Sequence, residues 1–251
     1  MQVLGIDIGG SGIKGAVVDT EKGEFLSDKF RLQTPSDTAP YKIIPCIHQV
    51  VKHFDWSGPI GIAIPEPVRN GIVLSTGNMS EEWRDVNAGL IFSELTDTDV
   101  YVINDADAAG IAELRFGVGK YEDGLVMVLT IGTGIGTALF HNGILIPNTD
   151  LGKLEIRGLT AEQRASETSR LQEGLKRKVW AKRLETVLQF YEKLLHPDLF
   201  IISGGVSNKS EKMLPFVTIR TRLAAASFLN NAGIVGAAIN TSDQLQLNQS
   251  V

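Results

Sequence analysis

Short apolar runs alternate with glycine-bearing or polar turns along the chain. Residues 3–8, 100–103 and 199–202 are apolar runs of strand length, and residues 125–147 read as strand, glycine-rich turn, strand, turn and strand. The run at 100–103 leads into residues 108–116, which have the pattern of a helix. The alternation predicts an α/β protein in which four glycine-bearing turns each follow a strand.

The first of these turns contains the spacing G-x-G-x-x-G at Gly10, Gly12 and Gly15. A dinucleotide-binding turn of this spacing opens a helix, but here residues 16–19 and 25–32 are strand-like. No Gly-Lys-Ser/Thr sequence ends the turn, so it is not a Walker A loop either. The pattern therefore predicts a β-meander whose first hairpin carries the glycines.

A second hairpin of the same kind lies within residues 125–147, with Thr130 and Thr133 around its glycines. Glycines without Cβ atoms let backbone N–H groups converge on an anion. One such hairpin is equally well read as a tight β-turn. Two matched hairpins favour a pair of similar lobes that clamp a phosphate.

Three polar residues, Asn104, Asp105 and Asp107, stand between the strand at 100–103 and the helix that follows. The carboxyl end of a strand beside a helix N-terminus is where α/β proteins place ligand chemistry. One of the acids can cap the helix, and Asp107 is the better placed of the two. Asp105 is then a carboxylate suited to taking a proton from a hydroxyl group.

Composition narrows the class of protein. The 251 residues carry a net charge of −5 and 43% hydrophobic residues, which argues against a general nucleic-acid binder. Cys46 is the only cysteine, so no intrachain disulfide or cysteine-based zinc site can form, and its isoleucine neighbours indicate a core thiol. No apolar run reaches the roughly 18 residues of a membrane span, which by default predicts a cytoplasmic protein.

One basic stretch interrupts this acidic chain. Residues 164–195 read as a long helical region with a break near Gly174, and its second part holds Lys176, Arg177, Lys178 and Lys182. Lys178 and Lys182 share a helix face through their i, i+4 spacing. Such a track would attract a polyanion, whereas the alternative is an ordinary solvated helix face.

The motifs GIDIGGSGIKG, NDADAAG, LTIGTGIGTAL and SGG, in this order, resemble those of the sugar kinases of the ROK family over residues 3 to about 239. The resemblance implies an α/β, actin/hexokinase/Hsp70-ATPase-like fold with a ribonuclease H-like motif, two lobes and a cleft between them. The longer stretches NDADAAGIAELRFG, LTIGTGIGTALFHNGILIPNT and NNAGIVGAA, with RAS at 164–166, resemble the polyphosphate glucokinases of that family.

The repeated hairpin predicts a division of the chain into two lobes, and the resemblance implies that a C-terminal helix returns to the first. The small lobe covers residues 1–106 and is joined by a C-terminal helix at 232–240. The large lobe covers residues 107–231. The polar residues 241–251 form a tail that is expected to be frayed.

Roles for individual residues follow from the same resemblance. It implies that Asp105 is the catalytic base and that Asn104 holds a sugar hydroxyl. Asp7 is expected to bind Mg²⁺ directly or through water. The expected phosphate-binding residues are, besides Asp7, Gly9, Gly10, Ser11 and Lys14 in the first turn, Thr130, Gly132, Thr133 and Gly134 in the second, and Gly204 and Gly205 in the turn that meets adenosine in ATP-using relatives.

The expected sugar site departs from the family pattern. In place of Glu-x-Gly-His the chain has Asp150 and Lys153, and Glu155 stands just beyond, where the polyphosphate-using members carry a further glutamate. All three are expected sugar-binding residues, and Glu155 is also a candidate partner for the lysine. Lysine adds a donor and a positive charge but no acceptor. Asn78, in the stretch NMSEEW, is a further candidate sugar ligand. Glu66 stands where relatives carry a small residue, and either contacts sugar or faces solvent.

The resemblance implies an Mg²⁺-dependent kinase that transfers a phosphoryl group from inorganic polyphosphate, and in some members from ATP, to the 6-hydroxyl of glucose. The alternatives are a strictly ATP-dependent hexokinase for mannose or glucosamine and a non-catalytic sugar sensor. A homodimer with no nucleic-acid or membrane partner is expected. None of the four histidines is assigned to catalysis.

Overall fold

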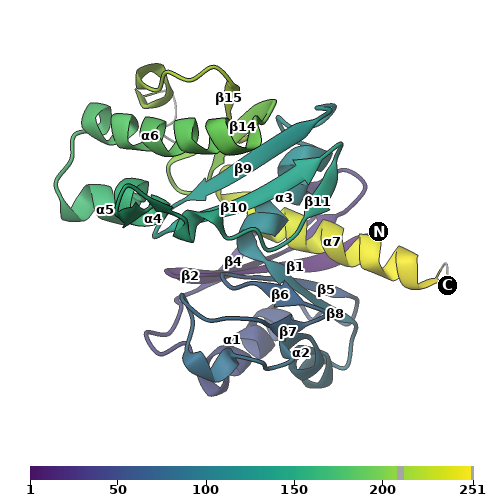
Figure 1. The fold of residues 1–251 in the computed structure, drawn as a ribbon. Coiled ribbons are helices and arrows are strands. Elements are labelled where there is room, and N and C mark those ends of the chain that lie inside the picture. The colour runs from purple at the N-terminus through teal and green to yellow at the C-terminus, as the bar shows by residue number, and fades with distance from the viewer. Residues whose placement is uncertain (208–211, 250–251) are drawn as a thin grey trace. The chain divides into compact units, whose positions relative to one another are not determined.

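The computed structural model describes residues 1–207 and 212–249 (Figure 1). The chain divides into two compact units. The first combines Met1–Ala112 with Asn231–Val251, and the second is Glu113–Asn230. Each unit is built around one mixed sheet. Among the described residues, no helix has the length and apolar character needed to cross a membrane.

The first unit's sheet has the order β3-β2-β1-β5-β8, with β4 also paired to β2. Its strands are β1 (Gln2–Gly9), β2 (Gly12–Asp19), β3 (Glu24–Phe25), β4 (Phe30–Leu32), β5 (Ile60–Ile64) and β8 (Val100–Asn104). β1 and β2 form an antiparallel hairpin, which confirms the predicted meander, while β1, β5 and β8 run parallel. The strand expected at 25–32 is instead two short strands. The Leu26 N–H still donates to the Val17 carbonyl of β2 at 2.8 Å, but the Val17 N–H then donates to the side-chain hydroxyl of Ser27 at 3.0 Å, which interrupts the backbone pairing.

Helices cover both faces of this sheet, with α7 (Ala232–Gln249) on one side and α1 (Pro40–His53) and α2 (Ala88–Thr96) on the other (Figure 1). The strands supply an apolar core that includes Ile6 and Ile62, both fully buried. The remaining elements are β6 (Val68–Arg69), β7 (Ile72–Val73), the short 3₁₀ helix η1 (Glu81–Trp83) and α3 (Asp105–Arg115), which starts directly after β8.

Small residues let α7 approach its neighbours closely. A Cβ on Gly236 would lie 1.7 Å from the carbonyl oxygen of Ala108 in α3, so only glycine fits there. The sequence predicted that this helix ends at residue 240 and that a frayed polar tail follows. The structure shows instead that α7 continues to Gln249. The first two residues after position 240, Thr241 and Ser242, are buried and hydrogen-bonded. Thr241 Oγ1 donates to the Ala237 carbonyl at 3.0 Å, and Ser242 Oγ accepts from Thr20 Oγ1 at 3.3 Å.

The second unit's sheet has the order β11-β10-β9-β14-β15. Its strands are β9 (Leu125–Ile131), β10 (Ile135–His141), β11 (Ile144–Ile146), β14 (Leu199–Ser203) and β15 (Arg222–Ala225). β9, β10 and β11 are antiparallel neighbours, and β9, β14 and β15 are parallel. The two glycine-rich hairpins thus occupy the same place in two sheets, each followed by two parallel strands.

The basic region forms three helices, α4 (Ala161–Ala165), α5 (Glu167–Gln172) and α6 (Arg177–Leu195). The predicted break near Gly174 is present, and a second break falls at Ser166. The indole N–H of buried Trp180 donates to the Ala165 carbonyl at 3.0 Å, which fixes α6 against α4. The unit is completed by η2 (Leu151–Lys153), the hairpin of β12 (Glu155–Ile156) and β13 (Leu159–Thr160), η4 (Leu214–Phe216) and η5 (Leu229–Asn231).

Candidate active site

Three neighbouring parallel strands bring polar residues to one edge of the first unit's sheet. The register pairs Asp7 of β1 with Ala63 of β5, and Ile64 of β5 with Asn104 of β8. Since parallel strands end at the same edge, Asp7, Glu66 and Asp105 converge there. Of these acids, the sequence singled out Asp7 and Asp105 for chemistry and left the role of Glu66 open.

Asp7 faces Lys14 across the β1–β2 hairpin, where the two residues are directly paired in register. The Lys14 ammonium lies 3.4 Å from Asp7 Oδ2. Burial raises the pKa of the Asp7 carboxyl above its ordinary value, and the charge and hydrogen bond of Lys14 act in the opposite direction. The N-terminal turn of α7 also lies against this carboxylate, since a Cβ on Gly233 would be 3.0 Å from Asp7 Cγ. A helix N-terminus favours negative charge.

The turn of this hairpin holds Gly10 and Ser11, both exposed. Side chains from the next segment fix its carbonyl groups. Thr34 Oγ1 donates to the Gly9 carbonyl at 2.5 Å, and Arg31 Nη2 donates to the Ser11 carbonyl at 2.7 Å. These two hydrogen bonds tie the turn to the segment that follows β2.

The cap of α3 is Asn104, not Asp107 as the sequence suggested. Asn104 Oδ1 accepts from the backbone N–H groups of Ala106 and Asp107 at 3.0 and 3.1 Å. Asp107 is buried in the helix's first turn. The amide nitrogen of Asn104 donates to the Glu66 carbonyl at 3.3 Å, so both ends of this amide already have partners.

Asp105 is left as the first residue of α3, free of the capping role. Burial raises the pKa of its carboxyl to about 7, with the negative charge of Asp7 as the next largest cause and those of Asp107 and Glu66 acting in the same direction. A general base works best when its pKa lies near the operating pH. A carboxyl with this pKa gains and loses a proton near neutral pH.

Glu66 is fully buried, so neither of the sequence's alternatives described its surroundings. Its Oε1 accepts the backbone N–H groups of Gly77, Asn78 and Met79 at 2.9, 2.5 and 2.6 Å. Asn78 in turn donates its side-chain amide to the Pro65 carbonyl at 2.9 Å. The predicted sugar ligand Asn78 thus sits on a loop that the Glu66 carboxylate organises. The sequence signal was an acid between two prolines directly after an apolar strand.

In the second unit, two of the predicted glycine turns lie next to each other. Thr130 and Ser203 pair in register at the ends of parallel strands β9 and β14. The turn after β14 has Gly204 at φ 80°, and a Cβ there would lie 2.6 Å from the carbonyl oxygen of Ile131. The loop between β9 and β10 is closed by a hydrogen bond of 3.0 Å from Gly132 N–H to the Gly134 carbonyl. Thr133, at its tip, is exposed, and Gly205 follows Gly204 in the adjoining turn.

The segment around Gly152, where the expected sugar site departs from the family pattern, packs against the β9–β10 hairpin. A Cβ on Gly152 would lie 1.7 Å from the Ile135 carbonyl oxygen, at the start of β10. On either side of this glycine, the Lys153 ammonium and Asp150 Oδ2 form an ion pair of 2.8 Å. The partner found for Lys153 is therefore Asp150, while Glu155, the partner suggested by the sequence, lies exposed on β12.

Sequence reasoning missed Glu162, which adjoins the second glycine loop. A Cβ on Gly134 would lie 2.7 Å from Glu162 Oε2. The sequence did contain a signal for a helix start at this place, because Thr160 and Gln163 have the spacing of a capping box. The structure shows that they form this box at the start of α4. This cap fixes Glu162 in the first turn of the helix.

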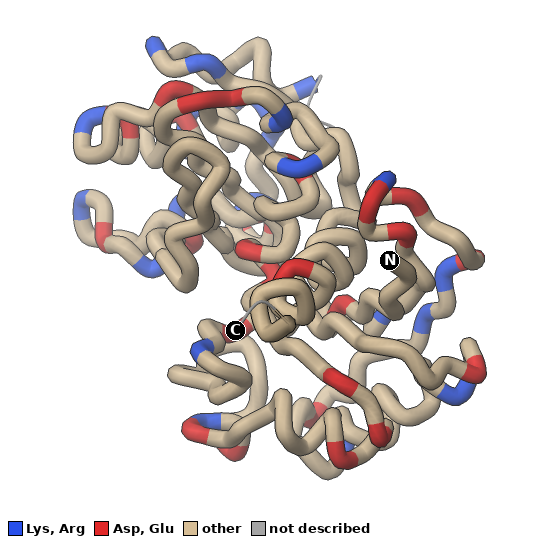
Figure 2. The backbone as a smooth tube through the Cα atoms, turned by 90° about the vertical axis from the view of Figure 1, so that its right-hand side faces the viewer, with Lys and Arg blue, Asp and Glu red and all other residues tan. Residues whose placement is uncertain are grey.

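The basic residues of α6 are partly engaged with acids. Lys182 pairs with Glu185 at 2.7 Å. The guanidinium of Arg183 makes two hydrogen bonds of 2.6 Å to Glu173. Lys178 lies over the ring of Phe216 at 5.7 Å and is exposed, as is Lys176, while Arg177 is half-buried. In Figure 2, basic and acidic stretches are interspersed along the backbone of each unit.

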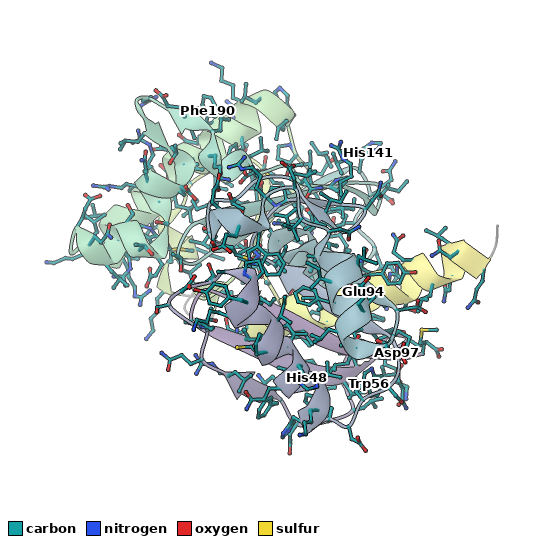
Figure 3. All side chains as sticks on the ribbon, turned by 90° about the horizontal axis from the view of Figure 1, so that it is seen from below. His48, Trp56, Glu94, Asp97, His141 and Phe190 are labelled. Carbon is teal, nitrogen blue, oxygen red and sulfur yellow. The ribbon has the colours of Figure 1, made fainter. Side chains whose placement is uncertain are left out.

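Histidines contribute nothing to these clusters. His48 on α1 and His141 at the end of β10 are both exposed and are labelled in Figure 3. Among the residues that the structure describes, no group of three or more His, Cys, Asp or Glu side chains is arranged to hold a metal ion.

These features together define a class of protein. Two sheets that repeat a glycine-rich hairpin and two parallel strands, with a buried carboxylate at a strand end, are typical of sugar kinases with the actin/hexokinase-like fold. Residues 3–150 match the sequence profile of the ROK family. The chain belongs to the ROK family.

Similar proteins cover nearly the whole chain. The polyphosphate glucokinase of Mycobacterium leprae is 44% identical over 96% of this chain and 75% of its own length. The polyphosphate glucokinase of Mycobacterium tuberculosis is 45% identical over 94% of this chain and 89% of its own length. The crystal structure of the inorganic polyphosphate/ATP-glucomannokinase from Arthrobacter sp. strain KM has a TM-score of 0.94 at 39% identity, covering 97% of this chain and 99% of that one. The expected fold class is confirmed.

Proposed function

We propose that this protein is a kinase that transfers the terminal phosphoryl group of inorganic polyphosphate to the 6-hydroxyl of glucose. The new bond joins the sugar's O6 to the terminal phosphorus, and the bond from that phosphorus to the bridging oxygen breaks. The hydroxyl proton passes to Asp105. The products are glucose 6-phosphate and a polyphosphate one unit shorter.

The observation that carries this proposal is the 44–45% identity to polyphosphate glucokinases over 94–96% of the chain. The site supports it independently. Phosphoryl transfer depends mainly on positioning and charge neutralisation, and a carboxylate base oriented toward the hydroxyl is the usual protein contribution. Asp105, with its pKa of about 7, has the protonation behaviour that such a base needs.

The other residues prepare the site. Lys14 and the Gly9–Ser11 turn supply positive charge and a fixed backbone beside Asp7. Gly132 and Gly134 supply the equivalent turn in the second unit, next to Gly204. These are the groups that we propose bind the phosphates of the donor.

We propose Mg²⁺ as the metal. It characteristically keeps several waters and binds through one or two carboxylates together with substrate phosphates, which fits a site without a preformed set of three acidic ligands among the described residues. Asp7 would hold it, directly or through water, because its buried carboxyl with a raised pKa gains from a nearby cation. When bound, the ion neutralises charge on the phosphoryl oxygens.

The acceptor specificity is open to a second sugar. The Arthrobacter enzyme is described as a glucomannokinase, and in this chain Asp150 and Lys153 replace the glutamate and histidine of the family pattern. Mannose is therefore the second candidate acceptor, and ATP the second candidate donor. Initial rates with glucose, mannose and glucosamine, each with polyphosphate and with ATP, test the proposal. Formation of product from glucose and polyphosphate supports the proposal. Formation of product with ATP but not with polyphosphate contradicts polyphosphate as the donor.

We expect Asp150→Ala to raise the KM for the sugar by about 10- to 100-fold, because it removes a charged hydrogen-bond acceptor. The KM for polyphosphate should change little. Steady-state kinetics with varied sugar measure this, with Asp123→Ala as the control, since Asp123 is an exposed acid of the same unit. An unchanged sugar KM would remove Asp150 from the sugar site.

Neutralising Lys178 and Lys182 together should raise the KM for polyphosphate several-fold while leaving ATP kinetics nearly unchanged. We expect a long polyanion to extend along α6 and the shorter ATP to stop before it, and the effect should shrink at high salt because exposed charges are screened. Lys193→Ala, in the last turn of the same helix, is the control. Equal losses with both donors would exclude a polyphosphate track on this helix.

The homodimer and the cytoplasmic location expected from the sequence stay predictions, as does the absence of a nucleic-acid partner. Exposed apolar side chains on the edge strand β11, Ile144 and Ile146, are a surface that a second copy could cover.

A further inference from the structure

Glu66 is a buried acid whose two carboxylate oxygens have different surroundings. It lies between Pro65 and Pro67 directly after β5, and its side chain is fully buried. Burying a carboxylate is unfavourable unless hydrogen bonds or opposite charges compensate. Its charge acts on the nearby carboxyl of Asp105, which is itself an acid, and hydrogen-bond donors supply the compensation.

Oε1 is fully used within the protein. Three consecutive backbone N–H groups, those of Gly77, Asn78 and Met79, converge on it at 2.5–2.9 Å. Successive amides around one anion form a nest of the kind that binds phosphates and carboxylates elsewhere. The Asn78 side chain closes the arrangement by donating to the Pro65 carbonyl. Glu66 therefore fixes the loop that carries Asn78.

Oε2 is buried and has no hydrogen-bond partner among the residues that the structure describes. A carboxylate oxygen accepts up to two hydrogen bonds, and leaving a buried one without any is unfavourable. Oε2 thus has the capacity for a donor from outside the chain. The charges restrict that donor, because an anionic phosphate would be repelled by Glu66 itself and by nearby Asp105, whereas a neutral hydroxyl would not.

We propose that Glu66 is a specificity-determining residue of the acceptor-sugar site, in which Oε1 orders the loop at 77–79 and Oε2 accepts a hydrogen bond from one ring hydroxyl of the sugar. The inference rests on the proposed function, since it assumes that the acceptor binds at the edge of the sheet where Asp105 lies. It adds a contact at a position where the sequence departs from the family pattern.

The experiment compares the wild type with Glu66→Gln across glucose and its 2-deoxy, 3-deoxy and 4-deoxy analogues. Glutamine has the same shape, so its amide oxygen can keep the three N–H bonds while its NH₂ group stands in the place of Oε2 and cannot accept. Calorimetric binding and kcat/KM are measured for each sugar, with Glu82→Gln, an exposed acid of the 3₁₀ helix η1, as the control. Circular dichroism checks the fold.

We expect Glu66→Gln to weaken glucose binding about 10-fold or more. For one of the three analogues, the one that lacks the contacted hydroxyl, the two proteins should bind equally. Equal weakening for all four sugars would mean that Glu66 only orders the loop and would overturn the contact, as would no weakening at all. Because binding is measured apart from turnover, a protein that binds sugars in this pattern but phosphorylates none would disprove the proposed function and leave the contact standing.

Discussion

Asp105→Asn should lower kcat for glucose phosphorylation by about 100- to 10,000-fold, the range over which general-base catalysis contributes. Asparagine keeps the size of the side chain but cannot take the hydroxyl proton. The sugar KM should change much less, since hydrogen bonding to the hydroxyl is retained. In the wild type, kcat/KM should rise with pH up to about 7, because only the ionised carboxylate is a base.

Steady-state kinetics at several pH values measure these effects. Asp97→Asn is the matched control, because Asp97 is exposed at the left-handed C-cap of α2, where asparagine is well tolerated (labelled in Figure 3). If Asp105→Asn kept more than about a tenth of the wild-type kcat, well outside the range for a lost general base, another group would have to be the base.

The same carboxyl predicts an effect on stability with a definite sign. Its folded pKa of about 7 lies above the ordinary value of 3.8, so the folded protein binds this proton more tightly than the unfolded chain. The stability that this provides is complete below about pH 4 and is lost as the pH rises toward 7. In metal-free buffer at pH 8, the free energy of unfolding of Asp105→Asn should therefore exceed that of the wild type by roughly 4 kcal/mol, the value that corresponds to a pKa shift from 3.8 to about 7. The variant should accordingly unfold at a higher denaturant concentration. At pH 4 the two should agree, and a difference independent of pH would mean that the titration of Asp105 is not its cause.

The second large effect is structural. Gly236→Ala should lower the free energy of unfolding by about 2 to 3 kcal/mol, because the added methyl would lie 1.7 Å from the Ala108 carbonyl oxygen. In the middle of a helix, alanine is otherwise favoured over glycine by about 1 kcal/mol. A lower free energy of unfolding in the variant therefore indicates that α7 lies this close to α3, and a higher one indicates that it does not.

Thermal unfolding followed by circular dichroism measures this change, and the melting temperature should fall by several degrees. Gly205→Ala is the control, since a Cβ at Gly205 meets nothing within 4 Å. Since α3 begins with Asp105, Gly236→Ala should also reduce activity at temperatures where the variant is folded. A melting temperature equal to or above that of the wild type would contradict this packing of α7.

Much of the fold could be predicted because its signals are local. The apolar runs and glycine turns identified both hairpins, since alternation between buried strand and turn is written into neighbouring residues. The position of Asp105 also followed from local order, as a polar residue between a strand and a helix. The resemblance to ROK kinases then supplied roles that the pattern alone left open.

The parts that could not be predicted depend on contacts distant in sequence. Glu66 is buried because residues 77–79 fold back onto it, which no local pattern shows. The cap at Asn104 replaced the expected cap at Asp107 because the helix begins earlier than its apolar pattern suggests. Residues 241–249 look like a polar tail, yet they continue α7 because Thr241 and Ser242 find buried partners.

The central claim is that polyphosphate is the phosphoryl donor and glucose the acceptor. The most direct measurement incubates the purified protein with glucose, Mg²⁺ and radiolabelled polyphosphate freed of nucleotides, and follows the label into glucose 6-phosphate. We expect labelled glucose 6-phosphate with the wild type and almost none with Asp105→Asn. If the wild-type protein transfers no label from polyphosphate while it phosphorylates glucose from ATP, the claim about the donor is wrong.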